Sequence, residues 1–225
     1  MRYKSVISAR FVSRPNRFIA VAELDGREEI CHVMNTGRMR ELLVPGAEIF
    51  LLPAENPARK TKFDLVAVRR GDEIVNIDSL APNRVAAEYI PTLFPCCKLI
   101  KPETKFGSSR FDFYIEDNFD KIFLEVKGVT LNRDGIAMFP DAPTLRGAKH
   151  LRELAAAKAQ GYRAAVLFVI AMKGIFSFAP NRETDPDFAD ALSEAARAGV
   201  EIYAADCRVE PDFIAAENKI PVCLE

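Results

Sequence analysis

The sequence has little of what most metal and redox sites require. It contains only two histidines and five cysteines. The number of cysteines is odd, and no two of them form a CxxC pair. These counts argue against a zinc site and against a disulfide framework. We expect reduced thiols.

Signals for export and membrane insertion are lacking as well. The first ten residues carry a charge every few positions and offer no apolar segment, which argues against a signal peptide. No stretch approaches the roughly 20 apolar residues of a membrane span. The sequence therefore predicts a cytoplasmic protein that does not enter a membrane.

Two common nucleotide-binding loops do not occur either. There is no G-x-x-x-x-G-K-[ST] loop and no G-x-G-x-x-G motif after a strand, so a small-molecule sugar enzyme of these types lacks support. We also find no convincing helix-turn-helix. This disfavours a regulator that reads DNA through a recognition helix.

Composition is that of an ordinary globular protein, with 49% hydrophobic and 28% charged residues in a chain of 225. The net charge is −1, so any nucleic-acid site must be local. Residues 1–80 hold 13 Lys and Arg against 11 Asp and Glu, and residues 81–225 hold 18 against 21. The more acidic second part suits a metal site.

The first part reads as short strands separated by turns, which predicts a small closed barrel of the OB-fold type over residues 1–81. A single short helix is expected over Arg38 to Leu43. The expected strands are Lys4 to Phe11, Asn16 to Leu24, Glu29 to Asn35, Glu48 to Pro53, Asp64 to Arg70 and Glu73 to Asp78.

Several arginines stand at loop positions of this predicted barrel. Arg14, Arg17 and Arg38 could line one electropositive face that binds nucleic acid. The alternative is that they form only the solvated rim that every barrel needs. Charge alone leaves both interpretations open.

Residues 82–225 have a different character and predict an α/β domain with a mixed sheet. Asn83 can cap a short helix that ends at Pro91. The apolar strand Arg163 to Ile170 should lie at the centre of the sheet, buried on both faces. The other expected elements are strands at Cys97 to Lys101, Ser108 to Glu116, Lys121 to Val126 and Val200 to Ala205, and helices at Pro143 to Gln160 and Pro186 to Ala198.

A predicted hairpin in this domain carries the residues with chemical potential. A turn over Asp117–Asp120 places Asp112 opposite Glu125. Two like charges at cross-strand distance destabilise a hairpin unless something compensates, and a divalent cation would do so. The backbone carbonyl of Val126 should lie nearby.

Strand alternation places Glu125 and Lys127 on one face of the sheet. Asp112, Glu125 and Lys127 are therefore candidate catalytic residues around Mg²⁺ or Mn²⁺, as in PD-(D/E)XK nucleases. Lys127 could orient a water or hold phosphate charge. The alternative is an ordinary cross-strand salt bridge.

A further metal ligand is expected from one of two carboxylates. Glu88 should face the sheet from the helix ahead of the hairpin, and Glu103 lies just before the hairpin. We slightly favour Glu88. Pro140-Asp141 follows the Glu-Val-Lys triplet, so we expect Asp141 to cap the next helix instead.

That next helix opens with basic residues. Arg146, Lys149 and His150 should lie along its polar side, where a helix N-terminus can seat phosphate. We expect these three, together with Arg110 of the hairpin, to contact nucleic acid.

Ordered blocks along the chain resemble the sugar fermentation stimulation protein A (SfsA) family. The blocks are Asn16-Arg17-Phe18, Asn35-Thr36-Gly37-Arg38-Met39, Arg59-Lys60-Thr61-Lys62, Ser109-Arg110-Phe111-Asp112-Phe113, Glu125-Val126-Lys127-Gly128-Val129-Thr130-Leu131, Phe139-Pro140-Asp141-Ala142, Arg146-Gly147 and Lys149-His150-Leu151.

The resemblance implies an N-terminal OB-like domain, a C-terminal PD-(D/E)XK-type domain and DNA binding linked to the regulation of sugar utilisation genes. It places the nuclease pattern on Asp112, Glu125 and Lys127. Two departures stand out: Ala171-Met172 replaces a polar pair, and Phe111 replaces a proline.

The leading hypothesis is a DNA-binding protein with a divalent-metal-dependent phosphodiester hydrolase site. DNA is favoured over RNA. The alternative is a non-catalytic DNA-binding transcriptional regulator of sugar (maltose) metabolism genes that keeps the nuclease scaffold.

Overall fold

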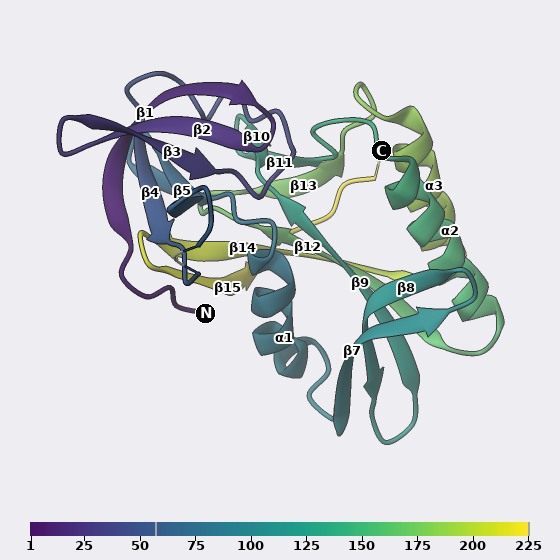
Figure 1. Cartoon of the computed structure of the whole chain (residues 1–225). Helices are drawn as coiled ribbons and strands as arrows, with labels where there is room; N and C mark the ends of the chain where they lie inside the picture. The colour runs from purple at the N-terminus through teal and green to yellow at the C-terminus, as the bar shows by residue number, and fades with distance from the viewer. Residues whose placement is uncertain (57, 225) are drawn as a thin grey trace.

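The computed structural model describes residues 1–56 and 58–224, and its first five strands form a closed barrel (Figure 1). The strand order is β3-β2-β1-β4-β5-β6; an additional pairing of β3 with β5 closes the barrel, and β6 is added to β5. The predicted closed barrel of the OB-fold type is confirmed. The strands are β1 (Ile7–Asn16), β2 (Ile19–Leu24), β3 (Arg27–His32), β4 (Glu48–Pro53), β5 (Phe63–Arg70) and β6 (Glu73–Asn76).

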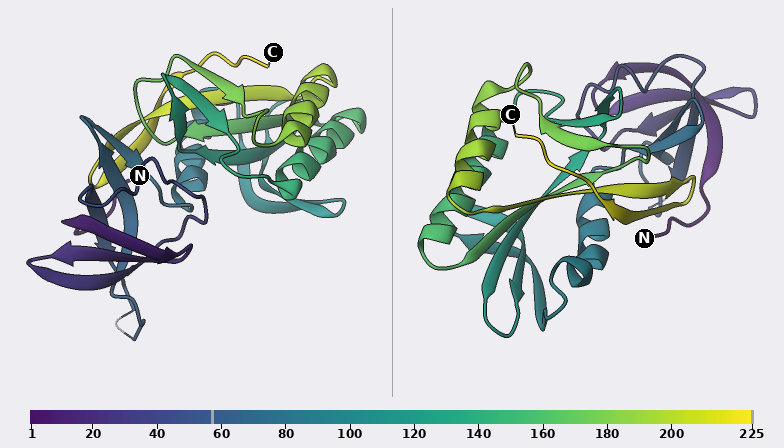
Figure 2. Two further views of the ribbon diagram at one scale, coloured as in Figure 1. Left: turned by 90° about the horizontal axis from the view of Figure 1, so that it is seen from above. Right: turned by 180° about the vertical axis from the view of Figure 1, so that it is seen from behind.

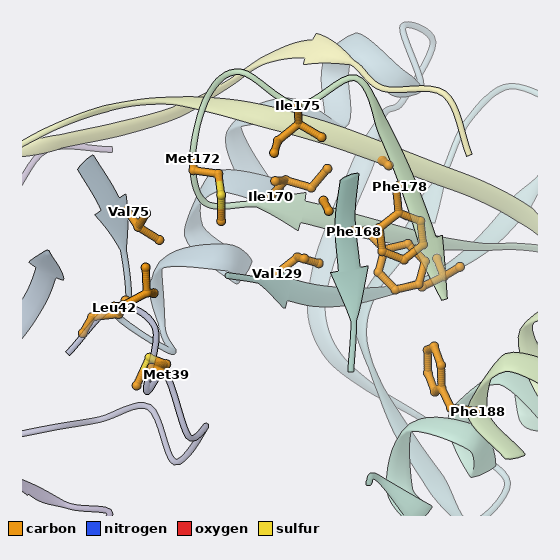
Figure 3. Close-up of a cluster of buried hydrophobic side chains, with 14 of the residues drawn as sticks. Met39, Leu42, Val75, Val129, Phe168, Ile170, Met172, Ile175, Phe178 and Phe188 are labelled. Atoms are coloured by element: carbon orange, nitrogen blue, oxygen red, sulfur yellow. The ribbon is translucent and has the colours of Figure 1, made fainter. Parts of the chain in front are cut away.

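The segment that was expected to form a helix, Arg38 to Leu43, contains only a turn over residues 40–42. Met39 has a positive φ of 46°, which a helix does not tolerate. The side chains of Met39 and Leu42 are buried, in a cluster that continues from the barrel into the α/β part (Figure 3). The burial of Met39 and Leu42 determines the conformation of this segment, and the helical pattern in the local sequence does not.

The rest of the chain forms a mixed six-stranded sheet in the order β15-β14-β12-β9-β8-β7. As predicted, the apolar strand β12 lies inside this sheet, pairs in parallel with β9 and β14, and is buried. The elements are α1 (Ala81–Leu93), β7 (Leu99–Phe106), β8 (Ser109–Glu116), β9 (Lys121–Val129), α2 (Leu145–Ala159), β12 (Arg163–Ile170), α3 (Pro186–Arg197), β14 (Glu201–Glu210) and β15 (Phe213–Lys219).

Helices cover both faces of this sheet. Val85 and Ile90 of α1 pack on one face with Leu124. On the other face, Leu154 of α2 and Phe188 of α3 belong to the second buried cluster. No helix within residues 1–56 and 58–224 is long and apolar enough to span a bilayer.

A second small sheet was not anticipated from the sequence. It consists of β10 (Leu131–Arg133), β11 (Ile136–Phe139) and β13 (Ser177–Pro180), in the order β10-β11-β13. Phe178 of β13 stacks on Phe168 of the central strand with 4.0 Å between ring centroids (Figure 3). This sheet carries the chain into the loop at Pro140-Asp141, beside the barrel.

The barrel and the α/β part lie side by side (Figure 2) and are joined by a buried polar network. The Tyr3 hydroxyl donates to Asp78 Oδ2 (3.0 Å) and accepts from Asn76 Nδ2 (2.9 Å). The backbone N–H of Asn76 donates to the carbonyl of Ala171 (2.9 Å). Burial, reinforced by Asp78, raises the pKa of Tyr3, so the hydroxyl stays protonated and acts as a fixed bridge.

Candidate functional site

The candidate site lies where strands β8 and β9 separate. Their ladder runs from Glu116 opposite Lys121 to Phe113 opposite Leu124, which is the predicted register. Both strands continue past this point, but the ladder does not. There the carboxylate of Asp112 takes the place of a ladder acceptor, because its Oδ2 accepts the N–H of Val126 (2.7 Å).

Asp112 is held between β9 and helix α1. Its second oxygen, Oδ1, accepts from Asn83 Nδ2 (2.8 Å) near the start of α1. Burial raises the pKa of Asp112, and the negative charge of Glu125 raises it further. The two carboxylates are therefore close enough to repel each other, as the hairpin register predicted.

Glu125 is 3% exposed, and its two oxygens have different surroundings. Oε1 accepts from Lys127 Nζ (2.5 Å) and also bonds His150 Nδ1. Oε2 is buried and has no hydrogen-bond partner within the described part of the chain. Burial raises the pKa of Glu125, but the bonds from His150 and Lys127 outweigh it and the pKa falls below its usual value. Glu125 is thus a buried carboxylate with one bare oxygen.

His150 supports Glu125 from helix α2. The prediction that it lies on the polar side of that helix is wrong, because His150 is buried together with Gly147, Leu151 and Leu154. Its Nδ1 faces the carboxylate, and its Nε2 accepts from Arg146 Nε (3.4 Å). The imidazole therefore lies between the Glu125 carboxylate and the guanidinium of Arg146. Leu145, the first residue of this helix, is 88% exposed.

The carbonyl of Val126 faces the same gap. In a β-strand the N–H and C=O groups of one residue point to the same neighbouring strand. Since the N–H of Val126 bonds Asp112 on β8, its carbonyl also points toward β8. The ladder between the two strands has already ended at Phe113 and Leu124, so this carbonyl lies beside the carboxylates.

The two further carboxylates expected at the site are directed elsewhere. The buried residues of α1 are Ala81, Val85, Ala86 and Ile90. This face leaves Glu88 58% exposed on its side chain, bonded to the amino group of Met1 (2.7 Å). Glu103 is exposed on β7 and pairs with Arg110 (3.2 Å). The expectation that Glu88 faces the sheet is therefore wrong.

Asn83 and Asp141 also differ from their expected roles. Helix α1 has no side-chain cap, and Asn83 reaches Asp112 instead. Helix α2 is capped by Thr144, whose hydroxyl accepts the N–H of Gly147 (3.0 Å). Asp141 accepts the N–H of Arg38 from the barrel (3.2 Å). Asn83 was missed as a site residue because its contact depends on how α1 sits on the sheet.

The donor set fits a hard divalent cation. Within residues 1–56 and 58–224, no three His, Cys, Asp or Glu side chains are grouped so that they could hold a metal by themselves. Asp112, Glu125 and the Val126 carbonyl nevertheless offer only oxygen atoms. Mg²⁺ takes such ligands and keeps several waters rather than being caged by protein. The bare Oε2 of Glu125 is the atom that a cation would satisfy.

The arginines of the barrel lie together, but they are not equivalent. Arg14, Arg17 and Arg38 line one hollow with Arg40. The guanidinium of Arg14 is already used, because it donates to the carbonyls of Gly37 (2.7 Å), Arg17 (2.8 Å) and Asn35 (2.8 Å). Burial lowers the pKa of Arg14. Arg14 therefore shapes the loop, whereas Arg17 and Arg38 are exposed.

Comparisons with known proteins agree with this architecture. A closed barrel followed by a mixed-sheet domain defines the class: an OB-like domain joined to an α/β domain with a mixed sheet. A family model described as the SfsA N-terminal OB domain matches residues 12–77. A model of the sugar fermentation stimulation protein RE domain matches residues 80–213. The chain belongs to the SfsA family.

Individual relatives match over the full length. Sugar fermentation stimulation protein homologs from Desulfitobacterium hafniense (strain Y51) and Clostridium beijerinckii are 53% and 51% identical. Each match covers 100% of this chain, and 99% and 100% of the relative. The structure of Pyrococcus furiosus SfsA in complex with Ca²⁺ is 31% identical, with a TM-score of 0.88 over 99% of this chain and 97% of that chain.

Proposed function

We propose that this protein is a cytoplasmic, divalent-metal-dependent phosphodiester hydrolase that acts on nucleic acid, DNA in preference to RNA. Mg²⁺ or Mn²⁺ is the proposed cofactor. We place the domain boundary between residues 81 and 82, with the barrel binding the strand and the α/β domain carrying the chemistry. The family name adds a link to sugar utilisation.

The observation that carries the proposal is the bare Oε2 of Glu125. A buried carboxylate oxygen without a partner costs free energy, and here a second, half-buried acid, Asp112, lies beside it. A purely structural pair would be expected to bond both oxygens. The Ca²⁺ in the solved relative agrees with a cation at such a site.

Asp112, Glu125 and the Val126 carbonyl would hold the cation. When bound, it supplies Lewis acidity and positive charge for a phosphodiester. Lys127 is placed on the Glu125 side of the sheet, where its ammonium can orient the attacking water or hold phosphate charge. His150 keeps the Glu125 carboxylate in position through its Nδ1–H.

Basic residues around the site would bind the phosphate backbone. Arg17 and Arg38 are exposed on the barrel, and Arg110, Arg146 and Lys149 are exposed on the α/β part. Exposed cations of this kind supply salt-dependent affinity for nucleic acid and little sequence preference.

The test is incubation of the purified full-length protein with labelled single- and double-stranded DNA in Mg²⁺, Mn²⁺ or EDTA. We expect cleavage with either metal, none in EDTA, and loss of cleavage in Lys127→Ala. Lys121→Ala, an exposed lysine of the same strand, is the matched control. Metal-independent DNA binding without cleavage by the wild type would support the non-catalytic regulator instead.

A further inference from the structure

A cleft of about 390 Å³ lies between the barrel and the α/β part, beside the candidate metal site. Its walls come from the barrel loop 35–37, the connection 76–83 and the loop 139–144. Asn83, which bonds Asp112, and Val126 both line it. The size falls within the roughly 300–1,000 Å³ of pockets that hold small organic molecules. The cleft thus opens directly next to the carboxylates.

The cleft lining differs in charge from the neighbouring arginine hollow. No lysine or arginine is among the described residues that line the cleft, whereas four arginines line the hollow. Amides and hydroxyls such as Asn35 and Thr130 alternate with the flat apolar groups of Phe139 and Pro82. Such a lining suits an uncharged, planar group with a hydrogen-bonding edge, not a phosphate.

The cleft and the arginine hollow are continuous, because Thr36, Gly37 and Ala142 line both. A strand that runs from the carboxylates to Arg17 and Arg38 therefore crosses the cleft. Its phosphates have cationic partners at either end, with the proposed metal on one side and arginines on the other. Among the described residues, the cleft between them is lined by two aspartates and by no lysine or arginine, so a base rather than a phosphate fits there.

We propose that this cleft is a nucleobase pocket that takes an unpaired base from a strand bound at the metal site. The proposal deepens the function proposed above and rests on it. A base inside a duplex cannot enter such a pocket without unpairing. The preferred substrate is therefore single-stranded or locally unpaired nucleic acid.

Hydrogen-bonding groups remain in the cleft for the edge of the base. Asn83 uses Nδ2 for Asp112, which leaves its Oδ1 as an acceptor. Asn35 uses Oδ1 for the N–H of Gly37 (2.8 Å), which leaves its Nδ2 as a donor. Asp141 uses Oδ2 for Arg38, which leaves Oδ1 as a charged acceptor, and carboxylates accept from base amino groups.

The two walls of the cleft approach each other closely at Gly37. A Cβ added at Gly37 would meet the carboxylate of Asp141, and the N–H of Arg38 donates to the same carboxylate. The barrel loop and the Asp141 loop are therefore in direct contact at this end of the cleft.

The test uses the full-length wild type and fluorescence anisotropy in Ca²⁺, with Mg²⁺-dependent cleavage measured separately. The probes are one single-stranded oligonucleotide, its duplex, and the same strand with abasic residues. Stacking of a base is worth about 1–3 kcal/mol, so the abasic strand and the duplex should each bind roughly 5- to 150-fold more weakly. Equal affinity for the three probes would overturn the pocket.

A second test uses Asp141→Asn, a substitution that removes the charge but keeps the shape of the side chain. In strands that differ at one base, this variant should change the rank order of affinity without changing the salt slope. Asp72→Asn, an exposed aspartate of the β5–β6 turn, should leave that order intact. An unchanged order in Asp141→Asn contradicts the assigned role of the carboxylate.

The outcomes separate the two proposals. Base discrimination without Mg²⁺-dependent cleavage retains the pocket and removes the hydrolase. Cleavage of intact and abasic strands at equal rates retains the hydrolase and removes the pocket. Failure to bind any of the probes removes both.

Discussion

The barrel and the α/β part each bury a carboxylate next to a histidine, and they bond it differently. In the barrel, Asp64 accepts from Arg59 at Oδ1 (2.7 Å) and Oδ2 (2.8 Å) and from His32 at Oδ1 (3.0 Å). In the α/β part, Glu125 concentrates its bonds on Oε1 and leaves Oε2 bare.

The difference separates a structural acid from a candidate site. Asp64 stands opposite His32 in the β3–β5 pairing that closes the barrel. Because both of its oxygens are hydrogen-bonded, Asp64 stabilises the contact between these two strands. Glu125 stands where two strands part, with one oxygen still able to bind a ligand. Burial of an acid is therefore uninformative by itself, whereas a buried oxygen without a hydrogen-bond partner marks Glu125 as able to bind a ligand.

The largest effect is expected at the bare oxygen. Glu125→Gln should lower Mg²⁺-dependent cleavage by at least about 10²- to 10³-fold, because the substituted amide is a weaker metal ligand and no longer supplies charge. Single-turnover cleavage and calorimetric metal titration measure the two losses together. Glu103→Gln, an exposed acid of β7, is the control. Equal activity of both variants would remove Glu125 from the site.

The next largest loss of activity is expected at His150, which bonds the Glu125 carboxylate. His150→Ala should lower activity and metal affinity by about 10- to 100-fold, which is typical when the partner of a metal ligand is lost. His150→Asn retains an N–H donor near the position of Nδ1 and should restore part of both. If the two variants are equally impaired, His150 matters only for packing.

The free energy of unfolding distinguishes Asp64 from Asp112 most directly. Asp64→Asn leaves Arg59 without its carboxylate and should lower the free energy of unfolding by about 1–3 kcal/mol, since Arg59 is one-third exposed and its charge is screened. Asp112→Asn removes repulsion from Glu125 and should leave stability unchanged or slightly higher in EDTA. Urea unfolding measures both. Destabilisation of the same size in Asp112→Asn would show that both acids are structural.

The contributions of Asp64 and Asp112 to the free energy of unfolding should depend on pH with opposite signs. Burial raises the pKa of Asp64, but Arg59 and His32 outweigh it and the pKa is lowered. Its contribution is present above about pH 4 and is lost as the pH falls through the lowered value. The pKa of Asp112 is raised by burial and Glu125, so its contribution is present below about pH 4 and is lost as the pH rises through the raised value. Unfolding of wild type and both variants across acidic pH in EDTA checks the two signs.

The sequence predicted the centre of the candidate site because that centre is local. A short turn sets the register that ends with Phe113 opposite Leu124, so Asp112 and Glu125 come next on the two strands, where the strands separate. Asn83 was not predicted as a site residue because its position depends on how α1 lies against β9. Pro82 of α1 is so close to Gly128 of β9 that a Cβ added at Gly128 would stand 2.6 Å from the proline ring. Such a contact between distant segments has no signature in local periodicity.

The failures have the same cause. Glu88 was placed inward from its spacing to Val85, but the buried stripe of α1 also uses Ala86 and Ile90 and turns Glu88 outward. In the small sheet, β11 pairs with β13, which lies about 40 residues further along the chain, so neither of these two strands shows its partner in the sequence. Tertiary packing decides these positions.

The smallest expected effect concerns the arginines. Arg17→Ala combined with Arg38→Ala should weaken DNA binding and reduce the salt slope by up to about 0.9 log units per lost duplex contact, or about 0.7 on single strands. Arg14→Ala should act differently, because Arg14 bonds loop carbonyls: it should lower stability more than it changes the salt slope. Anisotropy titrations at several salt concentrations, paired with unfolding curves, distinguish the two. If the Arg17 and Arg38 double variant retains both affinity and slope, these side chains are only the solvated rim of the barrel, and contact with the strand must come from Arg110, Arg146 and Lys149 on the α/β part.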